Sequence, residues 1–370
     1  MAESRALLPA LPGDTVRGLG NSRGWFAMTL RFTLAAAALT IACAPAAVAR
    51  DLTIASRTGL LQDAQQAVLL KPFTAVTGIA VQGAAREGGI DELRAHKDPG
   101  AGWDVVLLGG DELLGACDEG LLEKLDWSAV GGKDHYLPAA VSDCGLGSVA
   151  YSFVLAWDRD KFPAAPSWAD FWDVAKYPGK RGLMRGPRTN LEIALLADGV
   201  APGDVYRTLR TADGVERAFR KLDQIRPYAV WWESEQEAGR LLVSGEVLMT
   251  SATNAQIATT NRTQHRNFGM QWAGSLSAID SWAILKASPN QRQANQFLYF
   301  AGDSAIQVRL VTQAPYAGLA KGAVDDLPSG LAANLPLTPA NQTGALAVDE
   351  TFWRDNRDKL NQRFTAWLAR

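Results

Sequence analysis

Histidine and cysteine are scarce in this sequence, with 3 of each among 370 residues. General-base, thiol and zinc chemistry depend on these side chains, and the histidines (His96, His135 and His265) lack the spacing of metal ligands. Beyond residue 49 there is no GxSxG elbow, HExxH pair, GxxxxGK[ST] loop or GxGxxG turn. The 7 tyrosines include no adjacent pair, which argues against a ferric-ion site. We therefore expect no enzyme, metal or cofactor.

Apolar runs long enough to span a membrane are also lacking. The run from Phe32 to Ala42 has about half of the roughly 20 residues that a spanning helix needs, and Pro45 follows it. Ala47-Val48-Ala49 then has the small-x-small form that signal peptidase cleaves. The sequence predicts an extension and signal peptide over residues 1–49, and a mature periplasmic protein that begins at Arg50.

The expected state of the three cysteines depends on the predicted cleavage of the signal peptide. Met28 is a possible alternative start, and a lipid attached to Cys43 is a weaker alternative to cleavage. Cys117 and Cys144 remain as an even pair in an oxidising compartment, which favours a disulfide over two free thiols.

Charge of either sign shows no excess. The chain has 37 basic and 39 acidic residues without a basic tract, so a nucleic-acid partner is not expected.

A mature chain of about 320 residues exceeds the size at which one hydrophobic core usually stops growing, so two lobes are expected.

Strand and helix signals alternate along the chain. The predicted strands are 52–55, 79–81, 104–108, 153–157, 228–232, 246–250 and 281–285. The predicted helices are 62–76, 90–96, one from Ser167, 190–197, 213–225, one from Ser234 to Gly245, 288–301, 304–312 and 349–368. A Pro/Gly/Ala-rich stretch covers 315–339. This alternation predicts an α/β protein with two doubly wound sheets.

An ordered set of short motifs extends over nearly all of residues 52–370. They are QDAQ (62–65), PF (72–73), TG (77–78), WDVV (103–106), EGLL (119–122), SWADFW (167–172), YPGKRG (177–182), SGEV (244–247) and DSWAI (280–284). Together they resemble the spermidine/putrescine-type solute-binding proteins of ABC transporters. The resemblance implies a type II periplasmic binding fold, with a ligand cleft between two hinged lobes: 50–150 continued by 280–322, and 151–279 continued by 323–370.

The resemblance also implies where the ligand binds. Asp280 matches the carboxylate that holds the ligand amine in this family, and Asn254 matches the facing loop of the second lobe. A turn or helix cap is the alternative role of Asp280. Ser251, on the strand before Asn254, and Trp282, close to Asp280, are included in the predicted site.

Other positions depart from the polyamine pattern. Arg57, next to Thr58, stands where polyamine binders have an aromatic residue, and Arg185 lies in the loop where acidic residues are expected. A guanidinium repels a dication but suits a carboxylate, so the ligand is predicted to carry one amine and one carboxylate. A solvated surface is the alternative for both arginines. Trp232 and Tyr316 are candidates for an aromatic wall of the ligand site. The alternative is that they belong to the hydrophobic core.

The sequence thus predicts a monomeric periplasmic receptor that delivers a small amine-bearing solute to an inner-membrane ABC permease. A polyamine or a γ-aminobutyrate-like amino acid is the expected ligand. The alternatives are a polyamine receptor proper and a ligand sensor that signals to a membrane partner.

Overall fold

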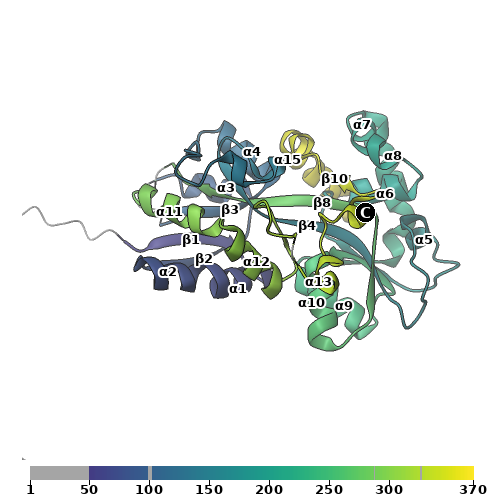
Figure 1. Cartoon of the computed structure of the whole chain (residues 1–370). Helices are drawn as coiled ribbons and strands as arrows, with labels where there is room; N and C mark the ends of the chain where they lie inside the picture. The colour runs from purple at the N-terminus through teal and green to yellow at the C-terminus, as the bar shows by residue number, and fades with distance from the viewer. Residues whose placement is uncertain (1–49, 99–101, 287, 326) are drawn as a thin grey trace, which may run out of the picture. The chain divides into compact units, whose positions relative to one another are not determined.

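The computed structural model describes residues 50–98, 102–286, 288–325 and 327–370 (Figure 1). The predicted signal peptide, its cleavage site and Cys43 lie outside these residues. Among the helices that the structure describes, none combines the length and the apolar character needed to cross a membrane.

The first half of the fold, as we name it, is built on three parallel strands in the order β2-β1-β3. They are β1 (Leu52–Arg57), β2 (Val81–Arg86) and β3 (Val105–Gly109). Helices cover both faces of these strands (Figure 1). One face carries α1 (Leu60–Gln65), a π-helical turn (Gln66–Leu70), α2 (Lys71–Thr77), α11 (Gln291–Ala301) and α12 (Ser304–Gln313); the other carries α3 (Ile90–Ala95) and α4 (Gly110–Asp118).

The second half of the fold contains three further strands in the order β7-β5-β6. They are β5 (Arg181–Met184), β6 (Ala229–Trp232) and β7 (Met249–Thr253), and β5 is parallel to both neighbours. Its helices are α5 (Trp168–Trp172), α6 (Asn190–Ala197), α7 (Val205–Leu209), α8 (Ala212–Ile225), α9 (Glu235–Ser244), α10 (Asn254–Gln264) and α15 (Glu350–Leu368).

Two long antiparallel strands, β4 (Gly145–Asp158) and β8 (Phe268–Ile284), pass through both halves. β8 pairs with β3 and β4 pairs with β7, so all of these strands lie on one hydrogen-bonded path. The predicted strands 153–157 and 281–285 captured only one end of each. The missed parts are rich in Gly, Ser and Ala, which have weak strand propensity, and pairing with neighbouring strands overrides that propensity.

The stretch from residue 315 to the terminal helix contains only short elements. These are β9 (Ala317–Gly318), α13 (Ser329–Ala332), α14 (Pro339–Gln342) and β10 (Leu346–Ala347). β9 pairs with β4, and β10 pairs with β8.

Capping residues fix several helix starts. Ser167 and Asp170 form the predicted capping box of α5, and Ser234 caps α9 by accepting the N–H of Glu237. α8 differs from the prediction, because Thr211 rather than Asp213 is its N-cap. The Thr211 hydroxyl accepts the N–H of Gly214 at 3.0 Å, so the helix starts at Ala212.

Each half of the fold has its own hydrophobic core. In the first half Phe297 packs edge-on against Phe73 and Trp282, with ring centroids 5.5 Å apart in both pairs. In the second half Trp231 packs edge-on against Phe364 and Trp367 of α15. The C-terminal helix is therefore part of the second half.

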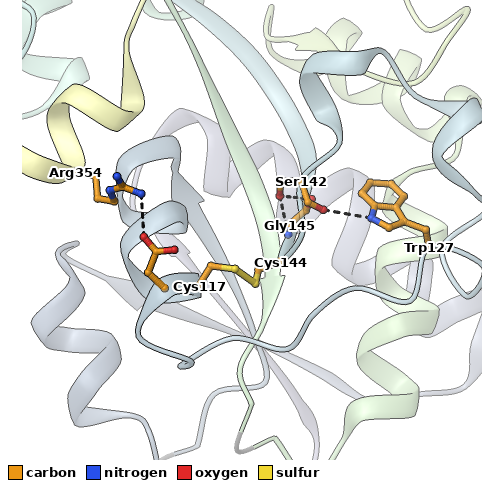
Figure 2. The surroundings of a disulfide bond; sticks show 7 residues. Cys117, Trp127, Ser142, Cys144, Gly145 and Arg354 are labelled. Atoms are coloured by element: carbon orange, nitrogen blue, oxygen red, sulfur yellow. Dashed lines mark hydrogen bonds and ion pairs between the residues drawn. A yellow bond between two sulfur atoms is a disulfide. The ribbon is translucent and has the colours of Figure 1, made fainter.

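The predicted disulfide between Cys117 and Cys144 is present (Figure 2). It joins the end of α4 to the residue before β4, across a Cα–Cα distance of 5.9 Å that suits a disulfide. Ser142 is fixed close by, because its hydroxyl donates to the Gly145 carbonyl and its own carbonyl accepts the Trp127 indole N–H at 3.2 Å. The bond therefore ties α4 to the entry of a strand that both halves share.

Removing this disulfide by the double substitution Cys117→Ser, Cys144→Ser should lower the free energy of unfolding by about 3 to 4 kcal/mol, because the open loop gains entropy in the unfolded chain. Chemical denaturation of the purified protein without reductant measures the change. The wild-type protein under reducing conditions is the matched control and should lose a similar amount. Equal stability of the oxidised wild type and the double variant would contradict the prediction.

Candidate functional site

A cavity of about 260 Å³ is lined by residues of both halves. The first half contributes the carboxyl ends of its strands and the turns that follow them. The second half contributes the end of β6 and the N-terminus of α9. The residues that line it include Arg57, Tyr151, Trp232, Glu235, Asp280 and Tyr316.

Asp280, on β8, provides one acidic group of the cavity. Its carboxylate accepts the Tyr151 hydroxyl at 3.2 Å. Burial raises the pKa of Asp280 above its ordinary value, while the nearby Arg57 opposes this rise. A carboxyl in this environment gains stability as an anion when a cation is placed beside it.

Glu235, the first residue of α9, provides a second acidic group. Its Oε2 accepts hydrogen bonds from the Thr253 hydroxyl at 2.9 Å and from the Tyr316 hydroxyl at 3.1 Å. Burial raises the pKa of Glu235 as well. The rings of Tyr151 and Tyr316 meet edge-on, with centroids 6.3 Å apart, so the two acids and two phenols form one continuous surface.

Besides Arg86, the cavity is lined by a second cationic side chain, Arg57 at the end of β1. Its Nη2 lies 3.2 Å from Oε2 of Glu112, whose side chain is only 1% exposed. The Arg57 side chain itself is 51% exposed, so part of the guanidinium remains free to meet a ligand. Pairing with Glu112 raises the pKa of Arg57 despite the opposing effect of burial, which keeps the side chain cationic.

Trp232 closes the cavity from the second half. It is 1% exposed, and its indole N–H has no hydrogen-bond partner among the described residues. The two halves also meet directly here. Gly59 faces the end of the Gln236 side chain and has a φ of 121°. The backbone conformation therefore favours glycine, whereas the flexible Gln236 side chain could move away from a larger residue.

Five of the nine predicted ligand-binding residues line the cavity: Arg57, Thr58, Trp232, Asp280 and Tyr316. The four that do not line it are Arg185, Ser251, Asn254 and Trp282.

Arg185 points away from the cavity because of strand alternation. Its backbone N–H donates to the Trp232 carbonyl at 2.8 Å, which continues the β5–β6 ladder, and the preceding Met184 faces the cavity. The Arg185 guanidinium instead pairs with Glu233 at 2.8 Å, and both side chains are more than half exposed.

Asn254 and Ser251 are fully buried beside the cavity rather than in it. The Asn254 side chain accepts the Ser152 N–H at 2.8 Å and donates to the carbonyls of Pro315 and Asn334. It thereby fixes β4 next to Tyr151. Trp282 packs in the core of the first half, with 1% exposure.

Tyr151 and Glu235 were missed by sequence reasoning. Glu235 lies between Ser234 and Glu237, whose helix-capping pattern already accounts for the polar residues there. The sequence therefore offered no reason to assign Glu235 a ligand. Tyr151 stood at an expected lobe boundary, and only the β4–β8 pairing places its hydroxyl beside Asp280.

Within the described part of the chain, no group of three or more His, Cys, Asp or Glu side chains could hold a metal ion. The cavity thus offers acidic, aromatic and cationic side chains at the meeting of two α/β halves. The two α/β halves have the fold of the type II periplasmic binding proteins.

The chain belongs to the bacterial extracellular solute-binding proteins, whose family model matches residues 69–339. It is 41% identical over 334 residues to a γ-aminobutyric acid-binding protein of Pseudomonas aeruginosa, which covers 90% of this chain and 95% of that protein. Members of this family bind solutes and are not enzymes.

Solved structures agree with this assignment. A GABA receptor shares 33% identity at a TM-score of 0.78, over 86% of this chain and 98% of that one. The binding protein MotA of A. tumefaciens B6, in complex with glucopine, shares 28% identity at a TM-score of 0.79, over 86% and 100%. The similarity to a spermidine/putrescine-binding protein of Streptococcus pneumoniae, at 16% identity and a TM-score of 0.70 over 86% and 100%, shows the fold alone.

Proposed function

We propose that this protein is the periplasmic substrate-binding component of an ABC importer for a small ω-amino acid such as γ-aminobutyrate. The observation that carries the proposal is the presence of Asp280 and Arg57 in one small cavity. A cavity of about 260 Å³ lies just below the range of roughly 300 to 1,000 Å³ that is usual for ligand sites, which suits a small solute.

The amine of the ligand would bind to the acidic surface. Asp280 supplies the ionised partner, and the Tyr151 and Tyr316 rings supply aromatic contact with the ammonium and the neighbouring methylenes. Burial raises the pKa of both tyrosine hydroxyls, so they stay neutral and donate to Asp280 and Glu235.

The carboxylate of the ligand would bind to Arg57 and to the indole N–H of Trp232. A guanidinium offers two parallel donors that match a carboxylate. A buried donor that lacks a partner costs free energy, so a ligand acceptor at Trp232 would recover that cost.

Charge distinguishes an ω-amino acid from a diamine. A zwitterionic ligand adds no net charge to the cavity, whereas a diamine places two positive charges beside Arg57. Glu87 and Glu233 also line the cavity, and Glu235 favours a diamine because it offers a buried carboxyl group in addition to Asp280. Burial raises the pKa of Glu235, and its Oε2 already accepts hydrogen bonds from Thr253 and Tyr316, so we assign it a role within the protein instead.

The two halves of the fold correspond to the lobes that we propose close over the ligand, with β4 and β8 as the crossing segments. Proposed lobe 1 comprises residues 50–150 and 280–322, and lobe 2 comprises 151–279 and 323–370. A ligand that contacts both lobes stabilises the closed arrangement, which an inner-membrane permease would recognise. We propose that the receptor works as a monomer and signals its loaded state in this way.

A thermal-shift screen with γ-aminobutyrate, putrescine and spermidine tests the proposal. A ligand at 100 times its Kd should stabilise the protein by about 2.7 kcal/mol. We expect γ-aminobutyrate to raise the melting temperature at concentrations where putrescine and spermidine do not. Tighter binding of putrescine would instead support a polyamine receptor, and a response to none of the three would reject the proposed ligand class.

A further inference from the structure

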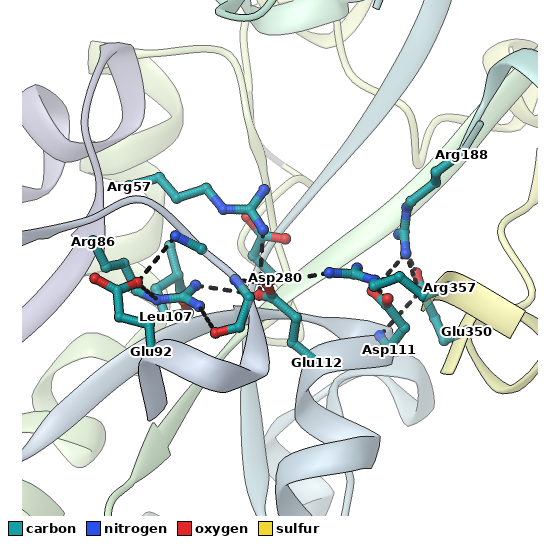
Figure 3. A network of polar contacts seen from close by, with 12 residues as sticks. Arg57, Arg86, Glu92, Leu107, Asp111, Glu112, Arg188, Asp280, Glu350 and Arg357 are labelled. Carbon is teal, nitrogen blue, oxygen red and sulfur yellow. Dashed lines mark hydrogen bonds and ion pairs between the residues drawn. The ribbon is translucent and has the colours of Figure 1, made fainter. Parts of the chain in front are cut away.

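A network of buried ion pairs surrounds the N-terminus of α4 and reaches the ligand cavity at Arg57 and Arg86 (Figure 3). Asp111 and Glu112, in the first turn of this helix, have side chains that are 2% and 1% exposed. Ionised carboxylates at such depth need partners. Four arginines supply them: Arg57 and Arg86 from the first half, and Arg188 and Arg357 from the second half.

Arg188 is the centre of the contact between the halves. Its Nη1 lies 2.6 Å from Oδ1 of Asp111, and its two terminal nitrogens form a bidentate pair with Glu350 at 2.8 and 2.9 Å. Oε2 of Glu350 in turn accepts the backbone N–H of Asp111 at 3.1 Å. Arg188 and Glu350 from the second half thus hold the N-terminus of α4 from the first half. We call Asp111, Arg188 and Glu350 the clasp.

The positions of the clasp residues indicate how the clasp is related to the closure of the two halves. Asp111 follows β3, and Arg188 follows β5, so each lies just beyond the carboxyl end of a strand. The loop of Arg188 is rigid, because the Asn190 side chain donates to the carbonyls of Met184 and Gly186. If the two halves move apart, the Arg188–Asp111 pair must break.

The clasp is joined to the ligand cavity through shared carboxylates. Glu112 pairs with Arg57, which lines the cavity, and Arg357 of α15 contacts both Asp111 and Glu112. Although burial raises the pKa of Glu112, the three surrounding guanidinium groups hold it well below its ordinary value, so Glu112 stays ionised at neutral pH. Figure 3 shows Arg57 and Arg86 on one side of this network and Arg188 on the other.

We infer that Arg188 is a positioning residue that stabilises the closed arrangement of the two halves and thereby sets ligand affinity without touching the ligand. This inference rests on the proposed function for its ligand. Arg188 does not line the cavity, so its effect on binding must pass through the conformational equilibrium. Each tenfold shift of that equilibrium toward the open state weakens the observed affinity up to tenfold.

The test compares Arg188→Ala with the wild-type protein in two measurements. Calorimetric titration should show γ-aminobutyrate binding about 10- to 100-fold more weakly. Spin labels at the exposed positions Val76 and Arg207, one in each half, should show a smaller closed population without ligand. The matched control is Arg94→Ala, which removes a bidentate Arg–Glu pair within the first half and should change neither measurement.

Unchanged affinity and unchanged label distances in Arg188→Ala would overturn the inference. If the wild-type protein does not bind γ-aminobutyrate, the proposed ligand fails, and the label distances alone then decide the role of the clasp. Should Arg188→Ala fail to fold, Arg188→Lys replaces it, because lysine keeps the charge but cannot form the bidentate pair with Glu350. Lysine should give an intermediate affinity; the wild-type value would overturn the inference.

Discussion

Asp280→Asn is expected to weaken γ-aminobutyrate binding by roughly 30-fold to several thousand-fold, equivalent to about 2 to 5 kcal/mol. The reason is that a buried ammonium loses its ionised partner, whereas the amide keeps the shape of the side chain and its hydrogen bond with Tyr151. Calorimetric titration of both proteins measures the change. A loss of less than threefold would place the amine elsewhere in the cavity.

The pH dependence of binding provides a second measurement for the same residue. Burial raises the pKa of Asp280, so protonation should remove the ligand's partner at a higher pH than for an ordinary aspartate. Affinity should therefore fall as the pH is lowered through that raised pKa. The Asn variant should lack this part of the pH profile. Identical profiles for the two proteins would show that another group titrates.

Arg57→Ala is expected to weaken γ-aminobutyrate on the order of 100-fold and to leave putrescine unchanged or bound more tightly. γ-Aminobutyrate should bind more weakly because its carboxylate loses its partner. Putrescine should not, because the repulsion of its second ammonium group is removed. The protein should still fold, because Glu112 keeps Arg86 and Arg357 as partners. Titrations of both proteins with both ligands measure the two changes in affinity, which should have opposite signs.

Arg185→Ala is the matched control for Arg57→Ala. Both are arginines that the sequence nominated for the ligand carboxylate, but Arg185 pairs with Glu233 at the surface. Exposed pairs of this kind contribute about 0 to 1 kcal/mol, so the variant should bind both ligands as the wild type does. Equal weakening of both ligands in Arg57→Ala would indicate a structural defect and not a carboxylate partner.

The regular elements of the fold could be predicted because their signals are local. Ser167 and Asp170 form the capping box that their spacing indicated, and Gly78 ends α2 in the left-handed conformation. The joining of the two halves into one sheet depends on the pairing of β4 with β8, between residues more than 100 positions apart. No local pattern carries that information.

The site shows the same division between local and distant information. Asp280 and Arg57 were nominated by position, and the structure brings them to one cavity. In the loop 185–188 the sequence nominates Arg185, but the direction of its side chain depends on strand alternation, and the partners of Arg188 depend on where α15 packs. Arg185 points outward, and Arg188 reaches Glu350 of the terminal helix. The partner of Arg188 is 162 residues away, which sequence reasoning alone could not identify.

The β4–β8 pair has a consequence for the order of events in binding. Its ladder has register shifts between Gly147 and Val149 and between Phe153 and Leu155, and Tyr151 lies between these two interruptions. Backbone bending concentrates at such irregularities. Tyr151 and Asp280 should therefore keep their mutual geometry in an open receptor, so that the association rate constant depends on this preformed anchor. If the halves close over the ligand as proposed, Trp232 reaches the ligand only on closure, and it should govern the dissociation rate constant and the lifetime of the complex.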